Sequence, residues 1–196
     1  MSTQDRLGTT DNFSAVLSKG GLFEDLLKTV GEFTVECRGP DGKLKWSDTI
    51  KNTVVTVGKN ALLDNSLEGS AYTVTGPFMG LISSTSYSGI NATDTMSAHA
   101  GWREAGNANT PTYSANRKTC VWSAASGGVK ALSAGLVFTF TGGGTVKGAF
   151  ICYGAGAVNT IDSTAGTLFA AGLFSGGDKT VGVSDTLTIS YSVTLT

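Results

Sequence analysis

Hydrophobic positions change their period early in the chain, which separates a helical N-terminal part from a strand-rich remainder. Within 13–30, apolar residues recur at helical spacing and Gly20-Gly21 interrupts them, so one kinked helix or two short ones are expected. Residues 1–12 are polar and are expected to form an arm. The apolar face of the predicted helix needs a partner surface, either the sheet of the same chain or a neighbouring subunit.

Downstream the pattern alternates with a period of two and predicts strands. Residues 33–38 and 44–50 alternate apolar with polar side chains on either side of Pro40-Asp41-Gly42. Because Pro presets φ and Gly accepts positive φ, this tripeptide favours a turn. A β-hairpin is therefore expected over this region.

The other predicted elements follow from shorter patterns. A short helix is expected over 58–67, ending before Gly69. A second hairpin is expected to join 135–141 to 145–153 through Gly142-Gly143-Gly144. The remaining predictions are strands over 53–57, 71–83 (one or two, broken near Gly76-Pro77), 117–123 and 166–174, a loop over 84–91 and a long irregular stretch over 94–116.

The C-terminal strand has the clearest pattern. Over 186–195, apolar residues alternate with Thr and Ser, so one face is apolar and the other carries only hydroxyl groups. A shift of one residue would expose the whole apolar face, which strongly specifies the register. We expect this strand to lie in the core.

Many short strands without strand–helix alternation predict a mainly β chain. We expect an antiparallel β-sandwich or jelly-roll-like domain over 33–196, with an N-terminal arm and short helix over 1–32.

The composition narrows the classes of function. Of 196 residues, 27 are glycine and only 15% are charged, and the formal net charge is −1. This balance lacks the basic patch that nucleic acid binding requires, so no nucleic-acid partner is expected. No apolar run approaches the roughly 20 residues of a membrane-spanning helix. The polar start also lacks the apolar region of a secretory signal, so no membrane partner is expected and synthesis is expected in the cytoplasm.

Cysteine and histidine offer little for catalysis or metal binding. The three cysteines, Cys37, Cys120 and Cys152, are odd in number and far apart, so inert buried thiols are expected in place of disulfides or a zinc site. His99 is the single histidine, and the chain has no Gly-x-Ser-x-Gly elbow. We interpret His99 as a loop residue hydrogen-bonded to backbone or a neighbour.

Two glycine motifs only partly match phosphate-binding loops. In 154–159 (GAGAVN) the third glycine of a dinucleotide fingerprint is replaced by Asn159. Gly58-Lys59-Asn60 precedes a predicted helix but lacks both the upstream glycine and the Ser or Thr of a P-loop. We expect neither motif to bind a nucleotide.

Carboxylates could in principle serve as a glycosidase pair. Most of them stand beside Gly, Ser or Thr, where Asp commonly forms turns, and Asp178 and Asp185 are interpreted as turn residues. The candidates are Asp94, Glu104, Asp162, Asp178 and Asp185. We expect no catalytic, cofactor-binding or metal-binding residues, and no enzymatic activity.

Several segments resemble a group of small virion proteins of tailed bacteriophages. The longest is 34–63 (TVECRGPDGKLKWSDTIKNTVVTVGKNALLD), and together the segments span most of 34–195. The others are 79–83 (MGLIS), 94–96 (DTM) with 99–102 (HAGW), 144–150 (GTVKGAF), 166–168 (GTL), 174–179 (FSGGDK) and 185–187 (DTL). Where the family often has Trp before Met-Gly-Leu-Ile, this chain has Gly76-Pro77-Phe78.

The resemblance implies a non-enzymatic particle protein, and within that class a capsid decoration (cement) protein that binds and stabilises the assembled shell. The alternative is a tail, collar or fibre component that contacts neighbouring tail proteins or a host receptor. The implied partner is the major capsid protein or another virion protein, with self-association into a dimer or trimer. The implied location is the capsid exterior, after synthesis in the host cytoplasm.

Overall fold

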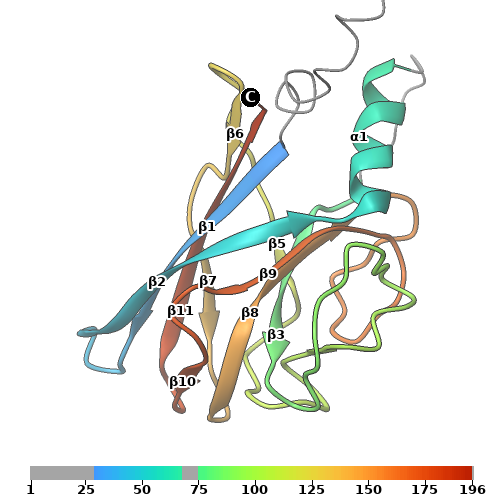
Figure 1. The fold of residues 1–196 in the computed structure, drawn as a ribbon. Helices are drawn as coiled ribbons and strands as arrows, with labels where there is room; N and C mark the ends of the chain where they lie inside the picture. The colour runs from blue at the N-terminus through green and yellow to red at the C-terminus, as the bar shows by residue number, and fades with distance from the viewer. Residues whose placement is uncertain (1–28, 68–74, 196) are drawn as a thin grey trace, which may run out of the picture.

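The computed structural model describes residues 29–67 and 75–195, and every ladder between its named strands is antiparallel (Figure 1). The prediction of a mainly β, antiparallel fold is confirmed. The strands are β1 (Thr29–Arg38), β2 (Leu44–Val54), β3 (Phe78–Ser83), β4 (Arg103–Glu104), β5 (Lys118–Thr119), β6 (Val129–Ala131), β7 (Leu136–Thr139), β8 (Gly144–Tyr153), β9 (Thr167–Phe174), β10 (Lys179–Val181) and β11 (Thr186–Leu195), and one helix of the described part is α1 (Thr56–Leu67).

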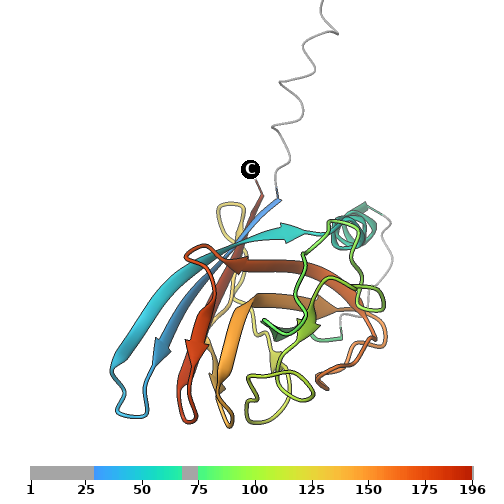
Figure 2. The same cartoon turned by 60° about the horizontal axis from the view of Figure 1, so that its bottom comes forward.

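The strands form one sheet in the order β4-β3-β8-β9-β2-β1-β11-β6. Near its two ends the segment 118–123 joins both sides: Phe78 pairs with Thr119, and the amide of Ser123 donates to the carbonyl of Ala131 over 3.0 Å. The sheet thus curls until its ends meet, and β1, β2 and β11 face β3, β8 and β9 across the interior (Figure 2).

The main core fills the inside of this curl. Along β1, Phe33 and Val35 are fully buried while Thr34 and Glu36 are exposed. β11 has the same alternation, with Leu187 buried as predicted. The alternation of period two is what orients every apolar side chain of these strands inward.

A second core covers the outer face of β3, β8 and β9. Ile82, Phe150 and Leu168 point outward from these strands and pack with Trp102 and Met96, which the long loop between β3 and β4 supplies. These strands are therefore buried on both faces, which explains their nearly unbroken apolar sequence. The irregular character of the loop was predicted; its role as a cover was not.

The predicted hairpin through Gly142-Gly143-Gly144 is wrong. Its two strands exist, but β7 pairs with β11, and β8 pairs with β3, β9 and β10. The amides of Thr141 and Gly142 donate to the carbonyl of Thr112, so the chain crosses from one half of the curl to the other instead of turning back.

Other boundaries also differ from the predictions. The strand expected over 53–57 is not separate, because β2 continues to Val54 and α1 begins at Thr56. The strand expected over 117–123 shortens to β5, and β4, β6 and β10 were not predicted. The first hairpin, the helix near 58–67, the loop over 84–91, and the strands near 166–174 and 186–195 are observed with small shifts of their ends.

The N-terminal predictions lie mostly outside the described residues. The arm over 1–12 and the helix over 13–28 belong to that part. The last two residues of the predicted helix, Thr29 and Val30, are in β1 instead, because they continue its ladder with β11. Strand structure thus begins before residue 33.

Candidate functional site

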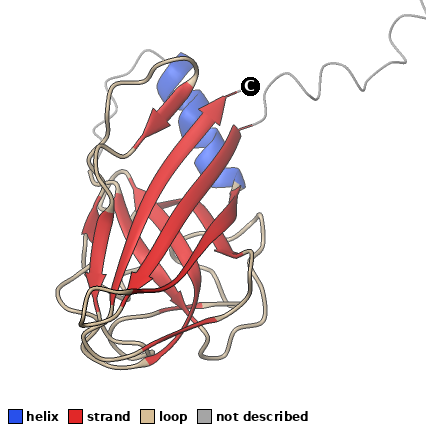
Figure 3. Cartoon of the chain, turned by 90° about the vertical axis from the view of Figure 1, so that its left-hand side faces the viewer, coloured by secondary structure: helices blue, strands red, loops and turns tan. Residues whose placement is uncertain are grey.

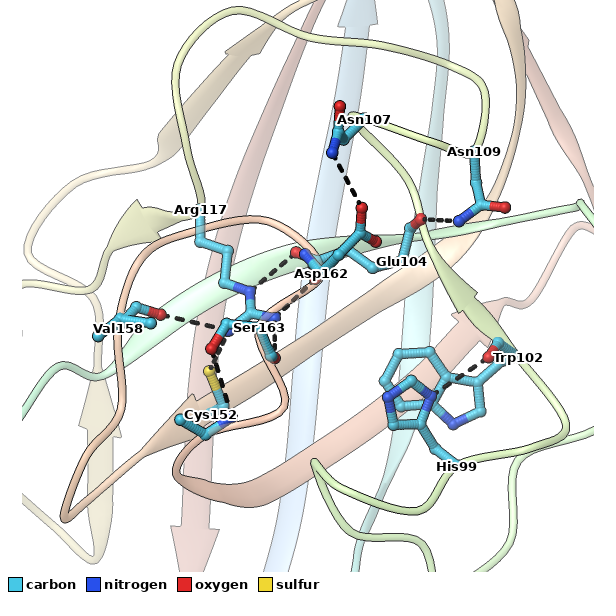
Figure 4. A network of polar contacts seen from close by, with 11 residues as sticks. His99, Trp102, Glu104, Asn107, Asn109, Arg117, Cys152, Val158, Asp162 and Ser163 are labelled. Atoms are coloured by element: carbon cyan, nitrogen blue, oxygen red, sulfur yellow. Dashed lines mark hydrogen bonds and ion pairs between the residues drawn. The ribbon is translucent and has the colours of Figure 1, made fainter.

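Polar side chains gather where β4 meets the loops around residues 117 and 162 (Figure 4). Arg117 donates from Nε to Oε1 of Glu104 over 2.8 Å and from Nη2 to Oε2 over 2.6 Å. Both side chains are almost fully buried. Arg117 also donates to the carbonyls of Val158 and Ser163, over 3.2 and 2.7 Å, so it joins β4 to the segment between β8 and β9.

Each residue of this pair stabilises the charged form of the other. Burial lowers the pKa of Arg117, but its hydrogen bonds with Glu104 outweigh burial and raise that pKa above its usual range. Burial raises the pKa of Glu104, and the hydrogen bonds from Arg117 oppose this rise. Glu104 also accepts a 2.8 Å hydrogen bond from the amide of Asp162. With its oxygens fully engaged, Glu104 has a structural role and is a poor general acid or base.

His99 lies beside this network without a catalytic partner. Its ring stacks on Trp102, with centroids 3.9 Å apart, and its Nδ1 lies 3.2 Å from the carbonyl oxygen of Trp102. The interpretation of His99 as a loop residue bonded to backbone is confirmed. Trp102 in turn donates from Nε1 to Oδ2 of Asp94 over 3.0 Å, so Asp94 serves the packing of the loop. Among the described residues, no hydroxyl or thiol hydrogen-bonds to His99.

A cavity of about 350 Å³ opens between these loops. Its walls include His99, Arg103, Glu104 and Asp162. The volume would suit a small ligand. Among the described residues that line it, no nucleophile is hydrogen-bonded to a base, and Asp162 is exposed and bonded to Asn107 over 3.3 Å.

The remaining candidate carboxylates, Asp178 and Asp185, contact other parts of the molecule. Asp185 is buried, pairs with Lys45 and accepts a 2.7 Å hydrogen bond from the amide of Gly182, so its interpretation as a turn residue is confirmed. Asp178 is exposed in the segment between β9 and β10 and pairs with Lys147 over 2.6 Å. Sequence reasoning could not find these partners, because both lysines lie on other strands.

The cysteines are free and buried, as predicted. Burial raises the pKa of Cys37 and Cys152 to about 11 and that of Cys120 to about 12. These thiols therefore stay protonated and unreactive at neutral pH.

The glycine motifs take ordinary structural roles. Gly154 closes a turn by accepting a 3.0 Å hydrogen bond from the amide of Ala157, and the residues after it form no helix. Gly58 lies inside α1, where an added Cβ would collide with the backbone of Phe169. Gly154 thus belongs to a turn, and Gly58 allows close approach of α1 to β9.

The outer face of β2, β1 and β11, which we call the polar sheet face, is an exposed surface of regular structure (Figure 3). Thr34 is exposed at its centre and pairs with Thr49 on one side and Ser190 on the other. The next outward rows are Glu36 with Ser47 and Thr188, and Glu32 with Lys51 and Ser192. The hydroxyl groups predicted for one face of the C-terminal strand thus continue onto β1 and β2, where they lie beside charged side chains.

The charges on the polar sheet face nearly cancel. Its two acids, Glu32 and Glu36, are matched by Lys51 and Arg38, and Arg38 pairs with Glu36 over 3.0 Å at an exposed position. The backbone groups of β1 are already engaged with β2 and β11 on both sides. A partner would therefore contact hydroxyl and charged side chains, with no free strand edge at the centre.

Within residues 29–67 and 75–195, His, Cys, Asp and Glu form no group of three or more that could hold a metal ion. No helix in those same ranges has the length and apolar character to cross a membrane. Comparison of the chain with protein-family models, with curated proteins and with solved structures returned no match.

Proposed function

We propose that this chain is a structural protein of a bacteriophage virion, a non-enzymatic capsid decoration (cement) protein that binds and stabilises the assembled shell. The observation that carries the proposal is the polar sheet face centred on Thr34, a nearly neutral surface of hydroxyl and paired charged side chains. The resemblance of segments such as 34–63 and 144–150 to small phage virion proteins supports the same role.

The physical task of a decoration protein suits such a surface. It must dock at many equivalent positions, so shape and hydrogen bonding matter more than a strong local charge. An oligomer that straddles several capsid subunits gains avidity from contacts that are individually weak. Because it binds the assembled state alone, it stabilises that state by mass action. In this proposal the partner is the major capsid protein on the capsid exterior, and the chain acts as a dimer or trimer.

The buried ion pair and the double core contribute rigidity to the role. Arg117 joins β4 to the segment between β8 and β9, and Trp102 packs in the second core on the outer face of β3 and β8. A block of fixed shape loses little conformational entropy when it docks. The cavity beside His99 adds no reactive group to this picture.

Co-sedimentation with emptied shells of the encoding phage tests the proposal. We expect the chain to pellet with shells, and Thr34→Arg combined with Ser190→Arg to weaken binding about 10-fold or more by placing bulky charges at the centre of the polar sheet face. Thr160→Arg is the matched control, because Thr160 is exposed in the loop after β8. Equal binding by both variants would remove the polar sheet face from the proposal.

Copy number in intact particles separates the shell from other locations. Hundreds of copies per particle support decoration of the capsid, whereas a few copies at one vertex would indicate a tail, collar or fibre component. Activity on ester or glycan substrates that disappears on changing His99, Asp178 or Asp185 would overturn the non-enzymatic role.

A further inference from the structure

An apolar groove of about 280 Å³ opens at the end of the sheet where β1 begins and β11 ends. Its walls include Leu62 of α1, Trp122, Phe169 of β9 and Val193 of β11, together with Lys130 of β6. In Figure 1 these ends, β6 and α1 all lie at the top of the molecule.

The apolar side chains around this groove are incompletely covered by the described residues. Trp122 and Val193 are only half-buried. Next to Trp122 in sequence, Val121 is 61% exposed. Apolar surface that gathers at one end of a domain marks a place where another element binds.

We propose that residues 13–27 of the same chain occupy this groove with the apolar face of a helix. The apolar residues Leu22, Phe23, Leu26 and Leu27 recur at helical spacing and need a partner surface. β1 begins at Thr29, which pairs with Leu195.

The position of the chain where β1 begins favours this occupant. Gly31 pairs directly with Val193, a wall of the groove, so residue 27 is four residues from that wall along the chain. A segment tethered this closely has an effective concentration in the millimolar range, which favours its own groove over that of a second copy.

Size and charge agree with the assignment. A cavity of about 150 Å³ holds a benzene-sized ring, so a groove of about 280 Å³ accommodates two side chains of the size of Phe or Leu. Glu24 and Asp25 lie between the apolar pairs of the segment, and Lys130 lies on the groove. The docking is independent of shell binding, and it leaves the polar residues 1–12 to reach a partner.

Hydrogen–deuterium exchange of the full chain, read by mass spectrometry, tests the proposal. We expect protected amides over 13–27, at a level that does not change with protein concentration. Leu62→Gln should lower that protection about 10-fold or more, because one apolar contact is lost. Leu63→Gln is the matched control, since Leu63 is exposed one position along the same helix and does not line the groove.

A second variant distinguishes loss of docking from damage to the fold. Phe23→Ser with Leu27→Ser changes the segment alone, and should remove protection over 13–27 while β8 keeps its own. If the amides of 13–27 in the unaltered protein exchange as fast as those of an unstructured peptide, the proposal is overturned. Protection that Leu62→Gln leaves unchanged would also overturn it, and so would protection that appears only at concentrations where a dimer forms, since the occupant would then be a second copy.

Discussion

Arg117 holds Glu104 through two parallel hydrogen bonds of 2.8 and 2.6 Å, with Glu104 on β4 and Arg117 in the loop 13 positions further along the chain. The pair is almost fully buried, so each charge depends on the other for stabilisation. The same guanidinium lies 5.3 Å from the centroid of the Phe150 ring, which links the ion pair to the second core. This contact organises the loop side of the molecule.

Replacing Arg117 with Met should therefore cost much more stability than a surface change. The substitution leaves the Glu104 carboxylate buried and unpaired, and we expect the free energy of unfolding in urea to fall by about 3–5 kcal/mol. Arg38→Met is the matched control, because it breaks the exposed pair with Glu36 and should cost less than about 1 kcal/mol. Equal losses in the two variants would contradict a structural role for the buried pair.

The strands were largely predictable because their patterns are local. The turn at Pro40-Asp41-Gly42 and the alternation over 186–195 determine face and register within a few residues. The Glu104–Arg117 pair was not predictable, since Glu104 lies in a polar stretch of loop-like composition. Nothing in that stretch indicates that the cover over β3 and β8 will bury its carboxylate.

The mistaken hairpin at Gly142-Gly143-Gly144 has a similar cause. Three glycines allow a tight turn but do not require one, and the pairing of β7 with β11 is decided by contacts about 50 residues apart in sequence. The polar sheet face is an intermediate case. The hydroxyl stripe of β11 was predicted, but its continuation through Thr34 to Thr49 depends on the order of the strands.

Asp48 should make the fold sensitive to acid. Burial acts to raise its pKa, but Lys179 at 2.8 Å, Ser175 and backbone amides outweigh burial and lower the pKa from 3.8 to about 2. As the pH falls, the unfolded chain takes up this proton before the folded chain does. The stabilisation is thus complete above about pH 4 and is lost as the pH falls towards 2.

Urea titrations at pH 6 and pH 2.5 measure this effect. We expect Asp48→Asn to remove about 1–2 kcal/mol of the difference in unfolding free energy between the two conditions. Asp41→Asn, at an exposed turn position, is the control and should leave most of the difference in place. An unaltered acid dependence in Asp48→Asn would show that other carboxylates determine it.

Gly148 should not tolerate even a methyl group. It lies on β8 opposite Leu173 of β9, and an added Cβ would collide with the carbonyl group of Gly172, which is part of the backbone and cannot rotate away. We expect Gly148→Ala to lower the unfolding free energy by about 1–3 kcal/mol. Gly89→Ala is the control, because no atom lies within 4 Å of the added Cβ. A near-neutral Gly148→Ala would mean that β8 and β9 can move apart at this point.

The three thiols should report on opening of the core. Because burial raises the pKa of Cys37, Cys120 and Cys152 to about 11 or 12, a reagent that needs thiolate should not react with the native protein at pH 8. In denaturant all three should react at once. Ala125→Cys, at an exposed loop position before β6, provides the control and should be labelled immediately in the native state.

In the Arg117→Met variant, we expect slow native-state labelling to accelerate first at Cys152, whose Sγ lies 3.5 Å from Nη1 of Arg117 in the unaltered protein. Labelling of Cys37, in the inner core, should accelerate later. Simultaneous labelling of both would instead indicate that the loop cover and the curled sheet unfold as one cooperative unit.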